Sequence, residues 1–309
     1  MFHVEHFTAL PCGATRMADL IRPPQPQMAQ VRTVATTIRR EVSLTGIGLH
    51  SGLAIHMTLA PSETGGIVFL RTDLGVQIPA SINQVVATRL STTIGQDGAE
   101  VQTIEHLLSA IYAVGVDHLL VKIDGPEVPI ADGSALPFIV LLEAAGMRQV
   151  SDVRTEIVPT SGIDVMQGER RVSIRPGDEL SITCEIRFDH PQIGRQTYLY
   201  RHSTEAFIRD IAPARTFCFE RDVARMQTQG QARGGSLDNA IVLTETGVRN
   251  DGPLRFQNEF VRHKILDLIG DIALLGRPLL GAVDAVCAGH TLHAEFVRQI
   301  QANESRPRV

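Results

Sequence analysis

The run EFVRHKILDLIGDI, residues 259–272, constrains the fold of this chain more than any other stretch. Apolar residues recur in it at spacings of three and four, which defines the buried face of an amphipathic helix: Phe260, Ile265, Leu268, Ile269 and Ile272. His263, Asp267 and Asp271 step by four, so their side chains stack on one side of that helix. The run therefore predicts a helix packed on a core, with an imidazole and carboxylates placed where they could bind a metal ion.

The composition sets the protein class. The chain has 309 residues, 43% of them hydrophobic, which is enough to fill the cores of two ordinary domains or one large one. The formal net charge is -5 and the basic residues are scattered, so no nucleic-acid-binding surface is indicated. No apolar stretch approaches the ~20 residues that span a bilayer, which argues against an integral membrane protein. The four cysteines form no C-x-x-C pair, so a zinc ribbon or a disulfide framework is not expected, and a reducing cytoplasm fits best.

Two halves of the chain show the same order of predicted elements. Strand-like runs from Thr37 lead to a helix over 103–115, with Thr103 as its N-cap and Gly115 as its stop, then a strand and a second helix. After Arg148 the strands restart, followed by a helix at 258–275, a strand and a helix from about residue 290. This pattern predicts a duplicated α+β unit. The expected divisions are a flexible extension (1–34), two α+β domains (35–150 and 151–303), an insert within the second (about 217–250) and a tail (304–309).

A metal site on the helix at 258–275 needs a further ligand, because catalytic zinc usually takes three protein groups and leaves a fourth position open. His106 is the best candidate, and Glu105 beside it could act as a general base. Each has an ordinary explanation, since the helix dipole favours a glutamate in a first turn and most histidines next to a core only pack there. The pair gains weight because it occurs together with His263 and Asp267 in the matching helix of the other half.

Other candidates are more ambiguous. His290 follows a glycine turn, and Asp271 could hold its imidazole protonated, because a neighbouring carboxylate raises the pKa of a histidine. Thr216 could be a plain strand threonine and Lys264 a solvated lysine, although nearness to a metal site would suit phosphate binding by Lys264. His50 is interpreted as structural. The remaining histidines of the folded region are assigned no function: His56, His118, His190, His202 and His293.

Several motifs in order make the chain resemble a known family over residues 37–300. The stretches TGIGLHSG, TIEHLLSA, PIADGSALPF, ARTF, EFVRHKILDLIGD and the GH of AGHTLH closely resemble the zinc-dependent UDP-3-O-acyl-N-acetylglucosamine deacetylases of lipid A biosynthesis. The resemblance implies two stacked α+β domains of similar topology, each a mainly antiparallel sheet with helices on one face, and an active site at their interface. It implies one zinc ion per chain, with His106, His263 and Asp267 as its ligands and Glu105 as the base. It further implies that the site is lined by Thr216, Lys264, His290 and Asp271, and that Phe217 of the ARTF motif contacts the substrate.

The same resemblance implies a reaction. Hydrolysis of the N-acetyl group would give UDP-3-O-acyl-glucosamine and acetate, with Glu105 accepting a proton from water and His290 and Thr216 stabilising the oxyanion. Lys264 would meet the diphosphate, and the insert would form a tunnel for the acyl chain, lined by small residues: Ala232, Ser236 and Ala240. The expected partner is a small molecule, the acylated UDP-sugar, and the expected state is a cytoplasmic monomer. One departure is His293, because the family often has asparagine there.

Two rival functions remain open at this point. The metal chemistry alone suits a zinc amidohydrolase or peptidase that acts on another amide, and a peptide substrate would need no tunnel. A structural-metal protein or a sugar-nucleotide-binding protein without turnover is less favoured, because structural zinc is normally closed by four protein ligands. Fe(II) could occupy a site of this kind in place of zinc.

Overall fold

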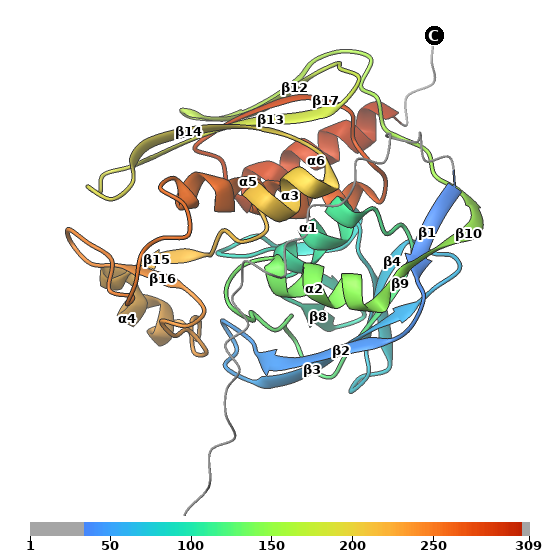
Figure 1. Cartoon of the computed structure of the whole chain (residues 1–309), viewed down its shortest axis with the longest axis horizontal. Coiled ribbons are helices and arrows are strands. Elements are labelled where there is room, and N and C mark those ends of the chain that lie inside the picture. The colour runs from blue at the N-terminus through green and yellow to red at the C-terminus, as the bar shows by residue number, and fades with distance from the viewer. Residues whose placement is uncertain (1–33, 305–309) are drawn as a thin grey trace, which may run out of the picture. The chain divides into compact units, whose positions relative to one another are not determined.

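Two five-stranded sheets of the same topology form the framework of residues 34–304, the part of the chain that the computed structural model describes (Figure 1). The first has the order β2 (Val42–Ile47), β3 (Ala54–Pro61), β9 (Leu119–Ile123), β4 (Ile67–Arg71), β5 (Val76–Pro79). The second has the order β11 (Ile163–Gln167), β12 (Arg170–Arg175), β17 (Gly281–Val286), β13 (Leu180–Phe188), β14 (Gly194–Arg201). In both sheets the third and fourth strands pair in parallel and all other neighbours are antiparallel. The predicted α+β class and its duplication are therefore confirmed.

The helices are α1 (Glu105–Val114), α2 (Leu136–Ala145), α3 (Thr204–Asp210), α4 (Glu220–Thr228), α5 (Glu259–Ile272) and α6 (His290–Glu304), with short 3-10 turns at Ile82–Gln84 and Ala273–Leu275. Four of the helices, α1, α2, α5 and α6, follow the sequence prediction closely, and α3 and α4 were not predicted. Gly115 ends α1 in a left-handed conformation (φ 76°), as predicted, because glycine adopts it without steric cost.

The prediction that Thr103 caps α1 is wrong. The N-cap is Ile104, and Thr103 lies before it with φ 58°, donating its hydroxyl to Glu127 Oε1 at 2.8 Å. Glu127 is fully buried and also accepts hydrogen bonds from the backbone N–H groups of His50 and Ser51. A tertiary hydrogen bond thus takes the hydroxyl that a cap would have used.

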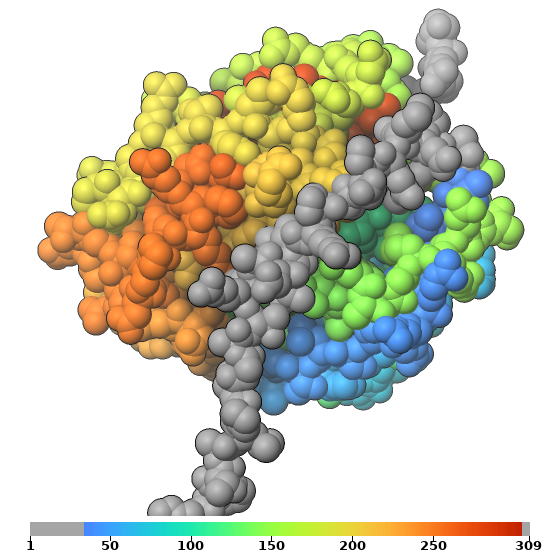
Figure 2. Space-filling view, viewed as in Figure 1, coloured from blue at the N-terminus to red at the C-terminus, as the bar shows by residue number. Residues whose placement is uncertain are grey.

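The smaller sheets complete the two halves. β1 (Val34–Ile38) pairs with β10 (Met147–Val153), and β6 (Val85–Ala87), β7 (Thr93–Gln96) and β8 (Ala99–Val101) form a three-stranded sheet. Within the predicted insert, β15 (Phe217–Phe219) and β16 (Ile241–Leu243) pair in parallel across α4. The insert contacts the turn between β2 and β3, where the backbone N–H of Arg233 donates to the carbonyl of His50. Figure 2 shows the insert, in orange, beside the blue strands of the first half.

α1 and α5 pack directly against each other between the two sheets (Figure 1). The apolar face predicted for α5 is buried throughout, from Phe260 to Ile272. Gly270 allows the close approach, because a Cβ atom there would lie 2.1 Å from the backbone oxygen of Glu105. The crossing therefore brings the first residues of α1 beside the polar side of α5.

The domain divisions stay a prediction, because the shared topology does not fix where one half ends. The extension (1–34) and the tail (304–309) lie outside the described residues apart from Val34 and Glu304. Among the helices of residues 34–304, none combines the length and apolar character needed to cross a lipid bilayer.

Candidate metal centre and catalytic site

Three side chains from the α1–α5 crossing converge on one point. His106 projects from the first turn of α1, and His263 and Asp267 project from successive turns of α5. The Nε2 atoms of His106 and His263 lie 3.7 and 3.3 Å from Asp267 Oδ1, and candidate ligand atoms of the three residues lie within 4.8 Å of one another. All three side chains are nearly inaccessible to solvent, at 2–4% exposure.

The chemistry of this cluster fits a divalent metal ion such as zinc. Burial lowers the pKa of His263 to about 3, so its imidazole is neutral and keeps a lone pair for a metal. Its Nδ1 donates to the carbonyl of Ala214 at 3.1 Å, which leaves Nε2 facing Asp267. Asp267 Oδ1 is buried and has no hydrogen-bond partner among the described residues. An unpaired buried carboxylate oxygen beside two imidazoles is costly unless a cation completes the group.

Lys264 partly balances the charge of the cluster. Its ammonium donates to Asp267 Oδ2 at 2.8 Å, and its side chain is 24% exposed. Burial would raise the pKa of Asp267, but the electrostatic interactions with the adjacent His263 imidazole and the Lys264 ammonium hold it well below its usual value. Asp267 is therefore a carboxylate at neutral pH, with one oxygen on Lys264 and the other free for a metal.

Glu105 lies beside the three ligands in the first turn of α1. Its side chain is 3% exposed, and its Oε2 accepts a hydrogen bond from the backbone N–H of Thr92 at 3.1 Å. Burial raises the pKa of Glu105, and the nearby charges of His290 and His106 oppose that rise. A carboxylate whose pKa moves toward neutrality is better suited to exchange protons at physiological pH.

His290 is the first residue of α6 and reaches the same site from the opposite side. Its Nδ1 lies 2.8 Å from Asp271 Oδ2, and its Nε2 lies 3.8 Å from Glu105 Oε1 and 3.9 Å from Asp267 Oδ2. Burial alone would lower the pKa of His290, but the charges of Asp271, Glu105 and Asp267 outweigh it and raise the pKa to about 9. Asp271 is itself held ionised, with a pKa of about 2, because His290 and His293 overcome the cost of its burial.

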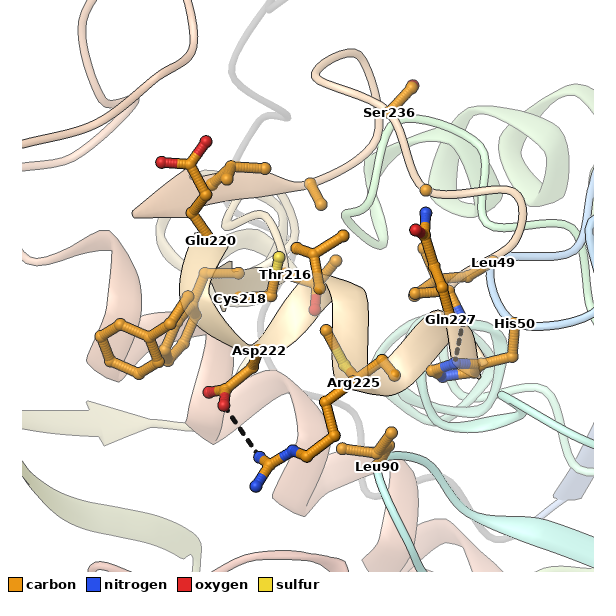
Figure 3. A pocket seen from close by; sticks show the side chains of 18 of the residues that line it. Leu49, His50, Leu90, Thr216, Cys218, Glu220, Asp222, Arg225, Gln227 and Ser236 are labelled. Atoms are coloured by element: carbon orange, nitrogen blue, oxygen red, sulfur yellow. Dashed lines mark hydrogen bonds and ion pairs between the residues drawn. The ribbon is translucent and has the colours of Figure 1, made fainter. Parts of the chain in front are cut away.

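An apolar pocket of about 720 Å³ adjoins the ligand cluster. Figure 3 shows side chains that line this pocket, among them Thr216 and His50. Lys264, Thr216 and Phe217 line its wall next to the cluster, and the ring of Phe217 lies 6.3 Å from that of His263. The insert supplies most of the remaining wall, including the three small residues expected there: Ala232, Ser236 and Ala240. His50, which the sequence analysis interpreted as structural, also lines the pocket.

The ARTF motif owes its place to a buried ion pair. Glu259, the first residue of α5, is fully buried and accepts hydrogen bonds from the backbone and side chain of Arg215. This fixes the segment so that the carbonyl of Ala214 meets His263 and the following residues, Thr216 and Phe217, line the pocket.

The structure therefore brings all nine candidate residues of the sequence to one region. It also adds two that sequence reasoning missed, Thr92 and His293, which both hydrogen bond Asp271. No sequence signal marks Thr92, because a threonine in a strand-rich segment is common. His293 is three residues after His290 on a helix, so the i, i+3 spacing could have suggested that it shares the same partner.

The chain matches the family model described as LpxC, UDP-3-O-acyl N-acetylglycosamine deacetylase, over residues 35–302. Among curated relatives, a UDP-3-O-acyl-N-acetylglucosamine deacetylase of Syntrophotalea carbinolica is 48% identical over 271 residues, covering 87% of this chain and 88% of the relative. The enzyme of the same name from Anaeromyxobacter sp. (strain Fw109-5) is 46% identical over 274 residues, covering 88% and 90%. The enzyme of Myxococcus xanthus is 46% identical over 272 residues, covering 87% of each chain. The chain thus belongs to the UDP-3-O-acyl N-acetylglycosamine deacetylase family.

Proposed function

We propose that this protein hydrolyses the N-acetyl group of UDP-3-O-acyl-N-acetylglucosamine, giving UDP-3-O-acyl-glucosamine and acetate, in lipid A biosynthesis. One observation supports this function most: a carboxylate and an imidazolium flank a two-histidine, one-aspartate cluster beside an apolar pocket. Family membership supplies the identity of the sugar nucleotide, which the geometry alone does not name.

His106, His263 and Asp267 would hold one zinc ion per chain. Two neutral imidazoles and one carboxylate leave a net positive charge on a bound divalent ion. The ion would act as a Lewis acid toward the amide and make water more acidic. Fe(II) has the same charge and accepts the same ligands, so the native metal is a matter for metal analysis.

Glu105 would act as the general base. Its carboxylate lies beside the ligands and is oriented by the N–H of Thr92, so it can accept the proton of the water that attacks the acetyl carbonyl. Its raised pKa reduces the energetic cost of holding that proton. The same carboxyl group can then return the proton to the departing sugar amine.

His290 would stabilise the oxyanion as an imidazolium. Asp271 accepts its Nδ1–H, which leaves the Nε2–H pointing toward the space between Glu105 and Asp267. A charged donor in a buried site favours a developing negative charge strongly, because little water screens it. Thr216 would add a hydroxyl donor, and His290 is a second candidate for protonating the leaving amine.

Lys264 and the pocket would hold the rest of the substrate. The Lys264 ammonium is partly exposed at the pocket wall, 5.5 Å from the centre of the Phe217 ring, where it can reach a phosphate oxygen. The wall of the pocket is mainly apolar, and its volume suits a fatty acyl chain. This favours the acylated sugar over a peptide amide.

We propose that the enzyme works as a monomer in the cytoplasm. A single chain contributes the ligands, the base, the imidazolium and the pocket, so the site needs no second copy. The described cysteines, Cys184, Cys218 and Cys287, are free thiols, as a reducing compartment would keep them.

Metal analysis combined with acetate release tests the proposed function. The purified protein should contain one zinc per chain and release acetate from UDP-3-O-acyl-N-acetylglucosamine, while Glu105→Gln should keep the metal and lose the activity. Release of amino acids from a peptide amide, without acetate release from the sugar nucleotide, would contradict the proposal.

A further inference from the structure

The carboxylate of Asp271 receives three hydrogen-bond donors in the buried centre of the molecule. Thr92 Oγ1 donates to Oδ1 at 2.5 Å, while His290 Nδ1 and His293 Nδ1 both lie 2.8 Å from Oδ2. All four side chains are buried. Among these three donor groups only the His290 imidazole has a place in the proposed reaction, so the Thr92 hydroxyl and the His293 imidazole need an explanation.

His293 is held in one protonation state. Burial lowers its pKa, so it is neutral despite its contact with Asp271. A neutral imidazole carries a single N–H, and the contact with a carboxylate oxygen places that proton on Nδ1. His293 therefore acts as a fixed donor to Asp271.

The two histidines restrict Asp271 from one helix. They lie three residues apart on α6 and approach the same oxygen, with ring centroids 5.9 Å apart and planes at 77°. The hydrogen bonds from Thr92 and His290 already oppose rotation of the carboxylate about its Cβ–Cγ bond. The donor from His293 opposes that rotation, because turning the carboxylate would break a buried hydrogen bond.

The orientation of Asp271 decides the orientation of His290. As long as Oδ2 faces α6, His290 keeps its Nδ1–H on that oxygen and its Nε2 toward Glu105 and Asp267. Thr92 ties this arrangement to the base, because its hydroxyl binds Asp271 and its backbone N–H binds Glu105.

We propose that His293 is a positioning residue that fixes Asp271 and, through it, the direction of the His290 ring. The inference deepens the proposed function, on which its kinetic part rests. His293 touches neither the three ligand residues nor the pocket wall in the hydrogen bonds and ring contacts of the described residues. Its contacts in this region are the hydrogen bond to Asp271 and the ring contact with His290.

The test compares two replacements of His293. In His293→Asn the side-chain amide keeps a donor near the position of Nδ1, whereas His293→Leu fills similar space without a donor. We expect His293→Leu to lower kcat about 10- to 100-fold, the range typical of outer partners of active-site histidines, with little change in KM or zinc content. His293→Asn should stay close to the wild type.

A second readout does not depend on turnover. ¹⁵N NMR of the metal-free protein reports the hydrogen bonding of the two ring N–H groups of His290. The wild type and His293→Asn should show one set of signals with His290 Nδ1–H in a strong hydrogen bond to Asp271, and His293→Leu should show a second set of signals or exchange broadening. If the wild type releases no acetate, the proposed function fails, while this spectrum still tests the orientation of His290.

Val297→Ala is the matched control. Val297 is one turn beyond His293 on α6 and fully buried, so its truncation disturbs packing without removing a polar contact. It should lower Tm and leave kcat and the His290 spectrum unchanged. The proposal is overturned if His293→Leu keeps the wild-type kcat and spectrum, if His293→Asn loses as much as His293→Leu, or if Val297→Ala loses kcat equally. Should His293→Leu not fold, His293→Ala removes the donor without adding bulk and takes its place.

Discussion

Gly270 is the position at which a single methyl group should move the proposed base. An alanine Cβ there would lie 2.1 Å from the backbone oxygen of Glu105 and 2.7 Å from its Cα. Close carbon–oxygen contacts in proteins are about 3.3 Å, so Gly270→Ala requires α1 and α5 to separate by roughly 1 Å. Neither side can yield by a rotamer change, because the obstructing atoms belong to the main chain of α1.

The expected effects on stability and activity differ in size. Alanine is favoured over glycine within a helix by about 1 kcal/mol, and overpacking typically costs about 1–3 kcal/mol, so the free energy of unfolding should fall by no more than about 2 kcal/mol. A displacement of about 1 Å at a catalytic group can cost on the order of 10²-fold in rate. We therefore expect Gly270→Ala to lose kcat/KM on the order of 10²-fold while remaining folded.

Acetate release and calorimetry on the same preparations measure both quantities. Gly162→Ala is the control, because a Cβ there would meet only Ile174 O at 3.5 Å, an ordinary contact. The control should match the wild type in both assays. Wild-type kcat/KM in Gly270→Ala would refute the idea that the approach at this glycine positions Glu105.

The remaining predictions concern the metal, the base, the pH dependence and the pocket. His263→Ala should lower zinc content and activity together while preserving the fold, and full zinc occupancy by elemental analysis would exclude His263 as a ligand. Glu105→Gln should keep its zinc and lose about 10²- to 10⁴-fold in kcat, the usual contribution of a positioned base, and a smaller loss would assign the proton transfer elsewhere. Because the pKa of His290 is raised from 6.5 to about 9, its contribution to the free energy of unfolding of the metal-free protein is fully present below pH 6.5 and is lost as the pH rises through 9. Denaturant titrations should show this loss in the wild type and not in His290→Ala. Loss of the same His290 proton should set the basic limb of the kcat/KM profile. This limb should lie at or below pH 9, because a bound cation lowers the pKa of His290. An unchanged basic limb in His290→Ala would mean that another group sets it. Ala240→Phe should reduce kcat/KM more for substrates with long acyl chains than for those with short ones. The control is Ala224→Phe, which should affect neither, because Ala224 is exposed on α4 and is not part of the pocket wall. Equal losses for both chain lengths in Ala240→Phe would argue against an acyl pocket.

The sequence by itself determined the local elements and the chemistry of the ligands. The spacing of apolar residues fixes α5 and its buried face, and the four-residue step between His263 and Asp267 places both on one side of the helix for any fold. Gly115 ends α1 because its backbone tolerates a left-handed conformation. The repeated order of strands and helices was also readable, because each element carries its own periodicity.

Only the tertiary structure decided which distant side chains meet and how each is oriented. Nothing local joins His106 to His263, and the crossing of α1 and α5 at Gly270 does so. Thr103 was misassigned as a cap because a buried partner, Glu127, takes its hydroxyl. His293 was assigned no function from the sequence because its contact partner, Asp271, is 22 residues away in sequence and 2.8 Å away in space. Hydrogen bonds between buried groups depend on angles and distances that the packing of two sheets and their helices sets, and residue spacing within one element cannot specify them.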